Sequence, residues 1–313
     1  MRQTATLETV IEQVHQQSAN HYDDIVPVSD MRFDSLERMD IAGQSFEVLP
    51  SAGKLLANRL RCPYSYLTRC PEDLQAENLN YWIEQEQKRR QTLFCRFDGS
   101  RVRAVFTERY IATDNMEILS AMLNHGFRPN QEVQYNLDEA MLVVKVPEYE
   151  RSFDVLARDL VVPGISLANS EVGALAFCIE VYLYRLVCSN GLIVKASAGA
   201  SRFKHISRKA LDQFPETLNQ AVADSRHRQD QFRISTETPV EKPLATIAMF
   251  NRQFQIGKQE GEAVENAWET EPGHTMFSVI NAYTHAAQLP MLTTEQAYRL
   301  EKAGGSILAM VKQ

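Results

Sequence analysis

The stretch from Val161 to Lys195, VVPGISLANSEVGALAFCIEVYLYRLVCSNGLIVK, holds the longest apolar run of the chain. Two turn-forming tripeptides interrupt it, Asn169-Ser170-Glu171 and Ser189-Asn190-Gly191. Between these turns lie the β-branched and aromatic residues that are typical of a strand. The pattern therefore predicts a sheet with this strand at its centre.

The two faces of the predicted strand differ. The apolar face carries Leu175, Phe177, Ile179, Val181, Leu183 and Val187, and the mixed face carries Ala174, Ala176, Cys178, Glu180, Tyr182 and Tyr184. A strand of this length would span roughly 50 Å, so we expect a bulge or a change of sheet near Tyr182. Arg185 falls on the apolar face, where a buried guanidinium needs a carboxylate. Glu171 is the candidate partner; alternatively, Arg185 reaches solvent at a sheet edge.

Three separated groups of motifs carry a family resemblance. The first is NSEVG (Asn169–Gly173), followed by YRLVCSNGL and by the basic segment RFKHISRK. The second is RLRCPYSYLTRCPEDLQAENLNYWI, from Arg59 to Ile83, and the third is INAYTHAAQ followed by LEKAGGSIL. Together they resemble the phage/plasmid-like protein family (domain of unknown function 932), whose members are found on prophages and conjugative elements. The resemblance covers roughly residues 45 to 310.

The resemblance implies residence on a mobile element and a role around DNA, but no established activity. None of the motif residues has an assigned catalytic role in that family. The motif residues in this chain are Asn169, Ser170, Glu171, Gly173, Arg185, Cys188, Asn190 and Gly191.

Composition is that of a globular protein, with 44% hydrophobic and 23% charged residues in 313. No apolar run approaches the length of a membrane helix, and the N-terminus is amphipathic and acidic rather than a signal peptide. We therefore expect a cytoplasmic protein without membrane contact. The five cysteines are odd in number and lack a CxxC motif, so we interpret them as reduced thiols and expect neither a metal nor another cofactor.

Charge is unevenly distributed along a chain whose net charge is −7. Residues 1–50 hold nine acidic and three basic residues, and 258–273 holds five Glu and one Lys. Between them lie two basic islands: 88–109 has seven basic and two acidic residues, and 195–209 has five basic and no acidic residues. This predicts a basic surface for nucleic acid between acidic ends that suit a basic protein partner. The sequence also leaves a homo-oligomer open.

Turn residues and periodicity divide the chain into four predicted parts. These are an acidic N-terminal segment (1–50), a helical subdomain (51–90), an α+β core (91–256) and C-terminal helices (257–313). The predicted fold class is α+β, with an antiparallel sheet of five to seven strands from about 92 to 194. A helical N-terminal part and a helical C-terminal third flank it. Residues 23–40 read as irregular, and Gly304-Gly305 suggests close packing of the last helix.

A hairpin is predicted where residues 92–97 and 101–106 flank Asp98-Gly99, a strong turn signal. Arginines alternate with phenylalanines there, which suits single-stranded nucleic acid; an ordinary hairpin with a polar outer face is the alternative. With the basic islands, this gives the candidate nucleic-acid-binding residues Arg89, Arg90, Arg96, Arg101, Arg103, Lys195, Arg202, Lys204, His205, Arg208 and Lys209.

No P-loop, GxGxxG, HExxH or GxSxG motif is present, so no catalytic residue is assigned. The leading hypothesis is a non-enzymatic, mobile-element protein that binds or anneals single-stranded DNA. Its expected element order is similar to that of Rad52-like annealing proteins. One alternative is a metal-dependent nucleic-acid enzyme with a site lined by Glu171, Arg185, Asn190 and His205. Another is a protein-binding module that modulates host defence.

Overall fold

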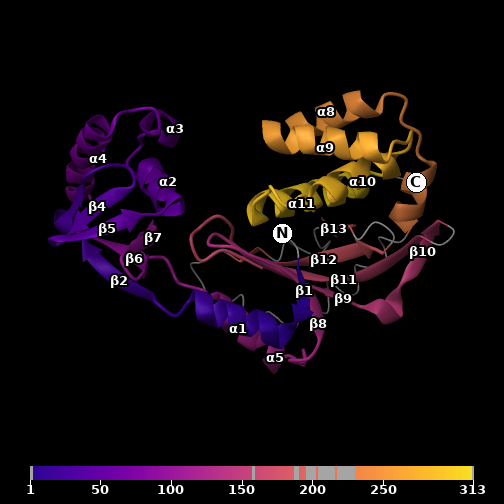
Figure 1. Ribbon diagram of the computed structural model, residues 1–313, viewed down its shortest axis with the longest axis horizontal. Helices are drawn as coiled ribbons and strands as arrows, with labels where there is room; N and C mark the ends of the chain where they lie inside the picture. The colour runs from indigo at the N-terminus through magenta and orange to yellow at the C-terminus, as the bar shows by residue number, and fades with distance from the viewer. Residues whose placement is uncertain are drawn as a thin grey trace.

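The computed structural model describes residues 3–156, 159–186, 190–194, 202–203, 216 and 230–311. Within these residues the strands form two separate sheets, each with helices on it (Figure 1). The α+β fold class is therefore confirmed, as is the group of helices at the C-terminus. Each sheet has its own cluster of buried apolar side chains, which divides the described chain into two lobes.

The large-sheet lobe comprises the described residues of 3–17 and 115–311. Its central strand order is β1-β8-β9-β11-β12-β13, with β10 beside β11 and β14 beside β12, and all described pairs are antiparallel. A short 3-10 turn, Tyr149–Arg151, precedes β10. The strands are β1 (Gln3–Thr6), β8 (Glu132–Leu137), β9 (Leu142–Pro147), β10 (Phe153–Leu156), β11 (Asp159–Asn169), β12 (Phe177–Arg185), β13 (Asn190–Val194) and β14 (Arg202–Phe203).

Helices cover both faces of the large sheet. Helices α1 (Leu7–Gln17) and α5 (Asn115–Asn124) lie on one face, and Figure 1 shows the C-terminal helices on the other. That second face carries polar side chains that form hydrogen bonds with α11. Lys145 Nζ in β9 donates to Glu301 Oε1 and Oε2 in α11 at 2.5 and 2.6 Å. The C-terminal helices are α8 (Pro243–Gln253), α9 (Lys258–Thr270), α10 (Met276–Ala286) and α11 (Thr294–Met310).

The last helix approaches the sheet at its two glycines, as the sequence suggested. A Cβ built on Gly305 would lie 2.0 Å from the carbonyl oxygen of Ile193 in β13, and one on Gly304 would lie 3.0 Å from Thr284. No side chain fits at Gly305 unless the helix moves away from the strand. A capping box formed by Thr293 and Gln296 begins this helix.

The small-sheet lobe comprises residues 21–106. Its strand order is β2-β6-β7-β5-β4-β3, and the β5–β7 pair is parallel whereas the others are antiparallel. A 3-10 turn, Val28–Asp30, joins β2 to β3. Its elements are β2 (His21–Pro27), β3 (Met31–Phe33), β4 (Arg38–Ile41), β5 (Gln44–Val48), α2 (Pro50–Arg59), α3 (Tyr64–Leu67), α4 (Glu72–Gln87), β6 (Thr92–Asp98) and β7 (Arg101–Phe106).

This lobe corrects two expectations from the sequence. Residues 23–40 were expected to be irregular, yet they contribute strands β2, β3 and β4. The 92–106 hairpin forms as predicted, but it pairs with β2 and β5 in the small sheet rather than opening the large one. The helices of 51–90 therefore belong to a lobe with its own sheet, which differs from the predicted division at 50 and 90.

The central strand is also shorter than expected. It begins at Phe177, after a turn in which Gly173 has φ +83°, and it ends at Arg185. Tyr182 has regular register partners on both sides, Gly164 in β11 and Ile193 in β13. The bulge expected near Tyr182 is therefore absent, because residues 174–176 belong to the turn and nine residues make an ordinary strand.

Candidate functional site

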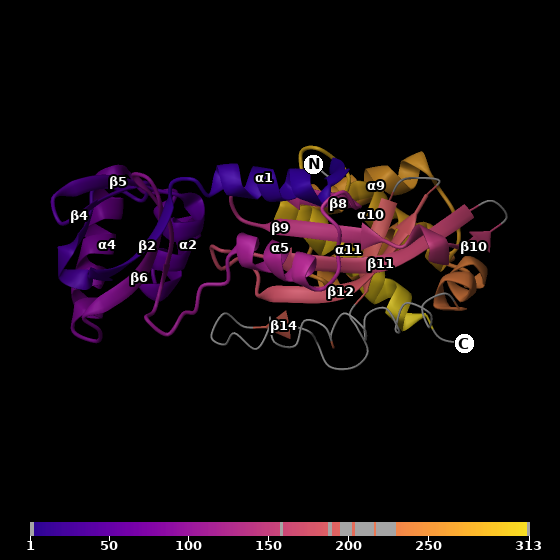
Figure 2. The ribbon, with the colours of Figure 1, turned by 90° about the horizontal axis from the view of Figure 1, so that it is seen from below.

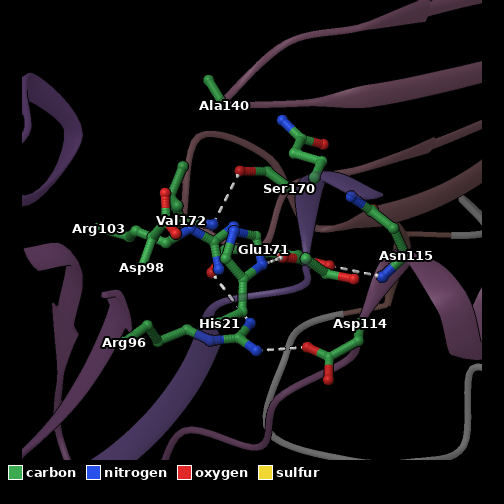
Figure 3. A network of polar contacts seen from close by, with 12 residues as sticks. His21, Arg96, Asp98, Arg103, Asp114, Asn115, Ala140, Ser170, Glu171 and Val172 are labelled. Atoms are coloured by element: carbon green, nitrogen blue, oxygen red, sulfur yellow. Dashed lines mark hydrogen bonds and ion pairs between the residues drawn. The ribbon is translucent and has the colours of Figure 1, made fainter. Parts of the chain in front are cut away.

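Asn169 is the last residue of β11, and Ser170 and Glu171 lie in the loop that follows it, where the two lobes meet (Figure 3). The Glu171 side chain is 6% exposed. Its carboxylate accepts a hydrogen bond from Arg103 Nη2 of the small sheet at 2.7 Å and another from the backbone N–H of Asn115 at 2.8 Å. Although burial raises the pKa of Glu171, the charge of Arg103 and the Asn115 N–H bring it below its usual value. Glu171 is thus a buried anion shared by both lobes.

A second buried guanidinium completes this contact. Arg96 donates to Asp23 Oδ1 at 2.9 Å, to Asp114, and to the backbone carbonyl oxygen of Glu171 at 3.2 Å. Burial disfavours its charge, but the two aspartates more than compensate and raise the pKa of Arg96 above its usual range. Asp23 comes from β2 and Asp114 precedes α5, so Arg96 also connects the lobes.

The remaining residues of the motif shape the loop that presents Glu171. Asn169 donates to the carbonyl oxygen of Thr113 at 3.0 Å and to Asn115 Oδ1 at 2.9 Å. Ser170 Oγ accepts from the backbone N–H groups of Val172 and Ala174. A Cβ on Gly173 would lie 2.9 Å from the ring of Phe106, so the loop packs tightly against the small-sheet lobe.

His21 stands at the edge of the same network. Its Nδ1 is 3.8 Å from Glu171 Oε2, and its side chain is 15% exposed. Burial and then the charge of Arg103 lower the pKa of His21, and together they outweigh the opposing charge of Glu171. The imidazole is therefore neutral near pH 7.

A cavity of about 530 Å³ opens beside this network, between the lobes. Its walls include Arg101, which pairs with Asp98 of its own hairpin and with Glu139 Oε1 of the β8–β9 turn at 3.1 Å. The charged and titratable side chains on its walls are His21, Glu47, Asp98, Arg101, Arg103 and Glu139.

The structure corrects the predicted partner of Arg185. Its Nη1 lies 3.4 Å from Glu271 Oε1, and its guanidinium lies over the ring of Phe277 at 4.9 Å. Glu171 pairs with Arg103 instead. The physical reason is that Arg185 ends β12, whereas Glu171 lies in the loop that precedes the start of that strand, so the strand length separates them.

The other motif residues lie away from Glu171. Asn190 and Gly191 begin β13, where Gly191 is the register partner of Tyr184 and leaves room for the Tyr182 ring. Cys188 and His205 lie outside the described residues. Glu171, Arg185 and Asn190 therefore do not come together as the site that the enzyme hypothesis assumed.

The candidate nucleic-acid residues separate into three groups. Arg96 and Arg103 are 3% and 5% exposed and engaged in ion pairs, so they are not on the outer face of the hairpin as expected. Arg101 lines the cavity, while Arg89 and Arg90 follow α4 at the surface, where Arg90 pairs with Glu86 at 2.9 Å. Of the second island, Arg202 is described only as part of β14; the other members, Lys195, Lys204, His205, Arg208 and Lys209, lie outside the described residues.

Sequence reasoning missed an exposed aromatic pair on α4. Tyr81 is 58% and Trp82 38% exposed, and their ring centroids are 5.2 Å apart in an edge-to-face arrangement. Gln85, Lys88 and Arg89 follow on the next turns of the helix and its end. We call Tyr81, Trp82, Gln85, Lys88 and Arg89 the aromatic–basic face of α4. Its signal in the sequence is that the Tyr-Trp pair falls outside the inward spacing of Leu79 and Ile83.

The family model described as "Domain of unknown function (DUF932)" matches residues 103–303. The chain belongs to this family. The DUF932 match begins within β7, so Arg103, Asn115 and the NSEVG motif lie inside it, whereas His21, Arg96 and α4 precede it. No curated protein and no solved structure matches the chain. The DUF932 description assigns no activity.

No group of three or more His, Cys, Asp or Glu side chains among the described residues is arranged to hold a metal ion. No described helix combines the length and apolar character needed to cross a bilayer. Cys62, Cys70 and Cys95 are free thiols, and burial raises the pKa of Cys95 to about 12.

Proposed function

We propose that this protein binds single-stranded DNA without catalysing a reaction, and that the aromatic–basic face of α4 is its contact surface. The exposed Tyr81–Trp82 pair carries the proposal. Large aromatic side chains are usually buried, and a single strand offers unpaired bases that stack on such rings while nearby cations meet its phosphates.

Charged residues lie on more than one side of α4. Trp82, Gln85 and Arg89 follow one another at spacings of three and four residues, so they share one side of the helix. Asp73, Glu77 and Glu84 lie on another side, where Glu84 is four residues before Lys88. Lys88 Nζ donates to Gln85 Oε1 at 2.9 Å, but neither Lys88 nor Arg89 forms an ion pair with any described residue, so both can meet phosphate without first breaking an ion pair.

The second basic island supplies further phosphate contacts in this proposal. Arg202 and Phe203 form β14, which pairs with Phe177 and Cys178 at the start of β12. That register places Arg202 and Phe203 beside the start of β12, close to the turn that follows the NSEVG motif. The resemblance to phage and plasmid proteins adds the proposal that the protein acts in the cytoplasm on mobile-element DNA, in recombination or strand annealing, as a homo-oligomer.

The test is a titration of a fluorescently labelled single-stranded oligonucleotide, followed by anisotropy across a range of salt. Trp82→Ala should weaken binding by about 1–3 kcal/mol, the usual contribution of one stacked base. Lys88→Gln with Arg89→Gln should make the slope of log affinity against log salt shallower by about 1.4, which is two contacts at roughly 0.7 each. Met249→Ala, which removes an exposed apolar side chain on α8, is the matched control and should change neither quantity.

Absence of salt-dependent binding by the unaltered protein would refute the proposal. A protein partner is then favoured by a second pocket of about 750 Å³ in the small-sheet lobe. Asp34, Glu37, Glu47 and Glu72 line it against a single arginine, Arg38, so it suits a basic segment. Product formation that depends on Mg²⁺ or Mn²⁺ would instead support the enzyme hypothesis.

A further inference from the structure

The cavity between the lobes contains two polar groups that the fold leaves without a partner. Arg103 is 5% exposed and uses Nη2 for Glu171, but its Nη1 is buried and has no hydrogen-bond partner among the described residues. Glu47 lines the same cavity, is exposed, and forms no ion pair with any described residue. A buried donor without a partner costs about 1–3 kcal/mol, which a ligand oxygen would recover.

The strand register sets how these two groups are spaced. Glu47 and Arg101 are partners in the parallel β5–β7 pair, so their side chains leave the same face of the sheet. Arg103 follows on β7 at a register shift of the β6–β7 pair, and it lines the same cavity as Glu47 and Arg101.

The other charges of the cavity are already engaged. Arg101 pairs with both Asp98 and Glu139, and Glu171 is satisfied by Arg103 Nη2 and Asn115. His21 adds a neutral ring to the wall. The cavity therefore presents Arg103 Nη1 as a hydrogen-bond donor and the Glu47 carboxylate as an acceptor. Its volume is in the usual range for a small-molecule site.

We propose that this cavity binds a guanine base of the single strand, with Arg103 Nη1 donating to O6 and Glu47 accepting from N1–H and the N2 amino group. The guanine site rests on the proposed binding of single-stranded DNA and specifies which base the protein would prefer. Guanine offers acceptors on one edge and two adjacent donors on the other, and guanidinium and carboxylate groups are the side chains that read such edges. Thymine has no amino group to donate to Glu47.

Equilibrium dialysis of the full chain against 5′-GMP and 5′-TMP tests the proposal without an oligonucleotide. GMP should bind at least tenfold more tightly than TMP. Glu47→Gln should weaken GMP binding about tenfold and leave TMP unchanged, because it replaces the carboxylate acceptor. Glu37→Gln, an exposed carboxylate of the same lobe outside this cavity, is the control and should leave both unchanged. Arg103→Lys, checked for folding by its thermal melt, should also reduce the preference for GMP.

The outcomes separate this inference from the proposed function. Trp82→Ala should weaken oligonucleotide binding yet leave GMP binding intact, since α4 does not line the cavity. Equal affinity for GMP and TMP, or GMP binding that survives Glu47→Gln, overturns the guanine site even if oligonucleotides bind. GMP binding that depends on Glu47 in a protein that binds no oligonucleotide supports the cavity as a nucleotide site and refutes only the single-strand proposal.

Discussion

At the scale of single residues, Glu171 joins two lobes through one carboxylate. It contacts Arg103, which lies 68 positions earlier in the chain and in a different sheet. The sequence analysis required a carboxylate for Arg185 and named Glu171, which was the wrong choice because Arg185 pairs with Glu271. Alternation along a strand tells which face a side chain occupies and says nothing about a residue in the loop before it. The pairing could therefore not be predicted from this strand alone.

Removing either member of the Arg103–Glu171 pair should be costly, because the other is then left buried and uncompensated. We expect Glu171→Gln and Arg103→Gln each to lower the free energy of unfolding by roughly 3–5 kcal/mol, and the double variant to cost less than their sum. Urea denaturation of the four proteins measures this. Glu171→Gln combined with Arg185→Gln is the matched control and should be additive. Additivity of the Arg103 and Glu171 changes would show that the pair contributes no coupling.

At the scale of elements, prediction succeeded where one face of an element is buried and failed where the element is an edge. The β6–β7 hairpin turns at Asp98-Gly99, as its turn signal indicated. Strand β2, in contrast, is an edge strand whose middle residues are exposed, and its two aspartates hide the alternation.

The contact between α11 and β13 gives a prediction at this scale. Gly305→Ala should destabilise the protein by about 1–3 kcal/mol, although alanine favours a helix, because its Cβ would meet the Ile193 carbonyl oxygen. Thermal unfolding measures the change. Gly261→Ala in α9 is the control, since its nearest contact is the Asn251 side-chain amide at 3.1 Å, which can rotate. Equal effects at the two glycines would mean that the close approach of α11 to β13 is not what limits substitution.

At the scale of the whole molecule, the small-sheet lobe stands beside the large sheet along the longest axis (Figure 2). Each lobe has its own apolar cluster, and each contains one of the two tryptophans, Trp82 in the small-sheet lobe and Trp268 in the large-sheet lobe. Composition and chain length allowed either one or two domains, and they could not show that residues 21–106 form a unit. That unit depends on pairing between β5 and β7, which are separated by two longer helices.

The ion pairs at the junction should make the two lobes unfold together. In Trp82→Phe and Trp268→Phe proteins the remaining tryptophan reports one lobe each, and we expect coincident urea transitions by fluorescence. Adding Glu171→Ala should separate the two transitions, because each lobe would then unfold at a urea concentration set by its own free energy of unfolding. Asp73→Ala, an exposed carboxylate on α4, should leave them coincident. Different transitions in the two Trp→Phe proteins that retain Glu171 would contradict the prediction that the lobes unfold together.

In the chain, the small-sheet lobe is inserted into the large-sheet lobe. Helix α1 precedes it and α5 follows it, and both helices cover the same face of the large sheet. The DUF932 match starts at Arg103, inside β7, and not at the edge of that insertion. A recombination breakpoint at the start of the match would separate β7 from β6 and leave a sheet with an open edge. Paired breakpoints at 18–20 and 107–113 would transfer the lobe whole. Descendants of such an exchange would still need an arginine late in the incoming sheet to meet Glu171.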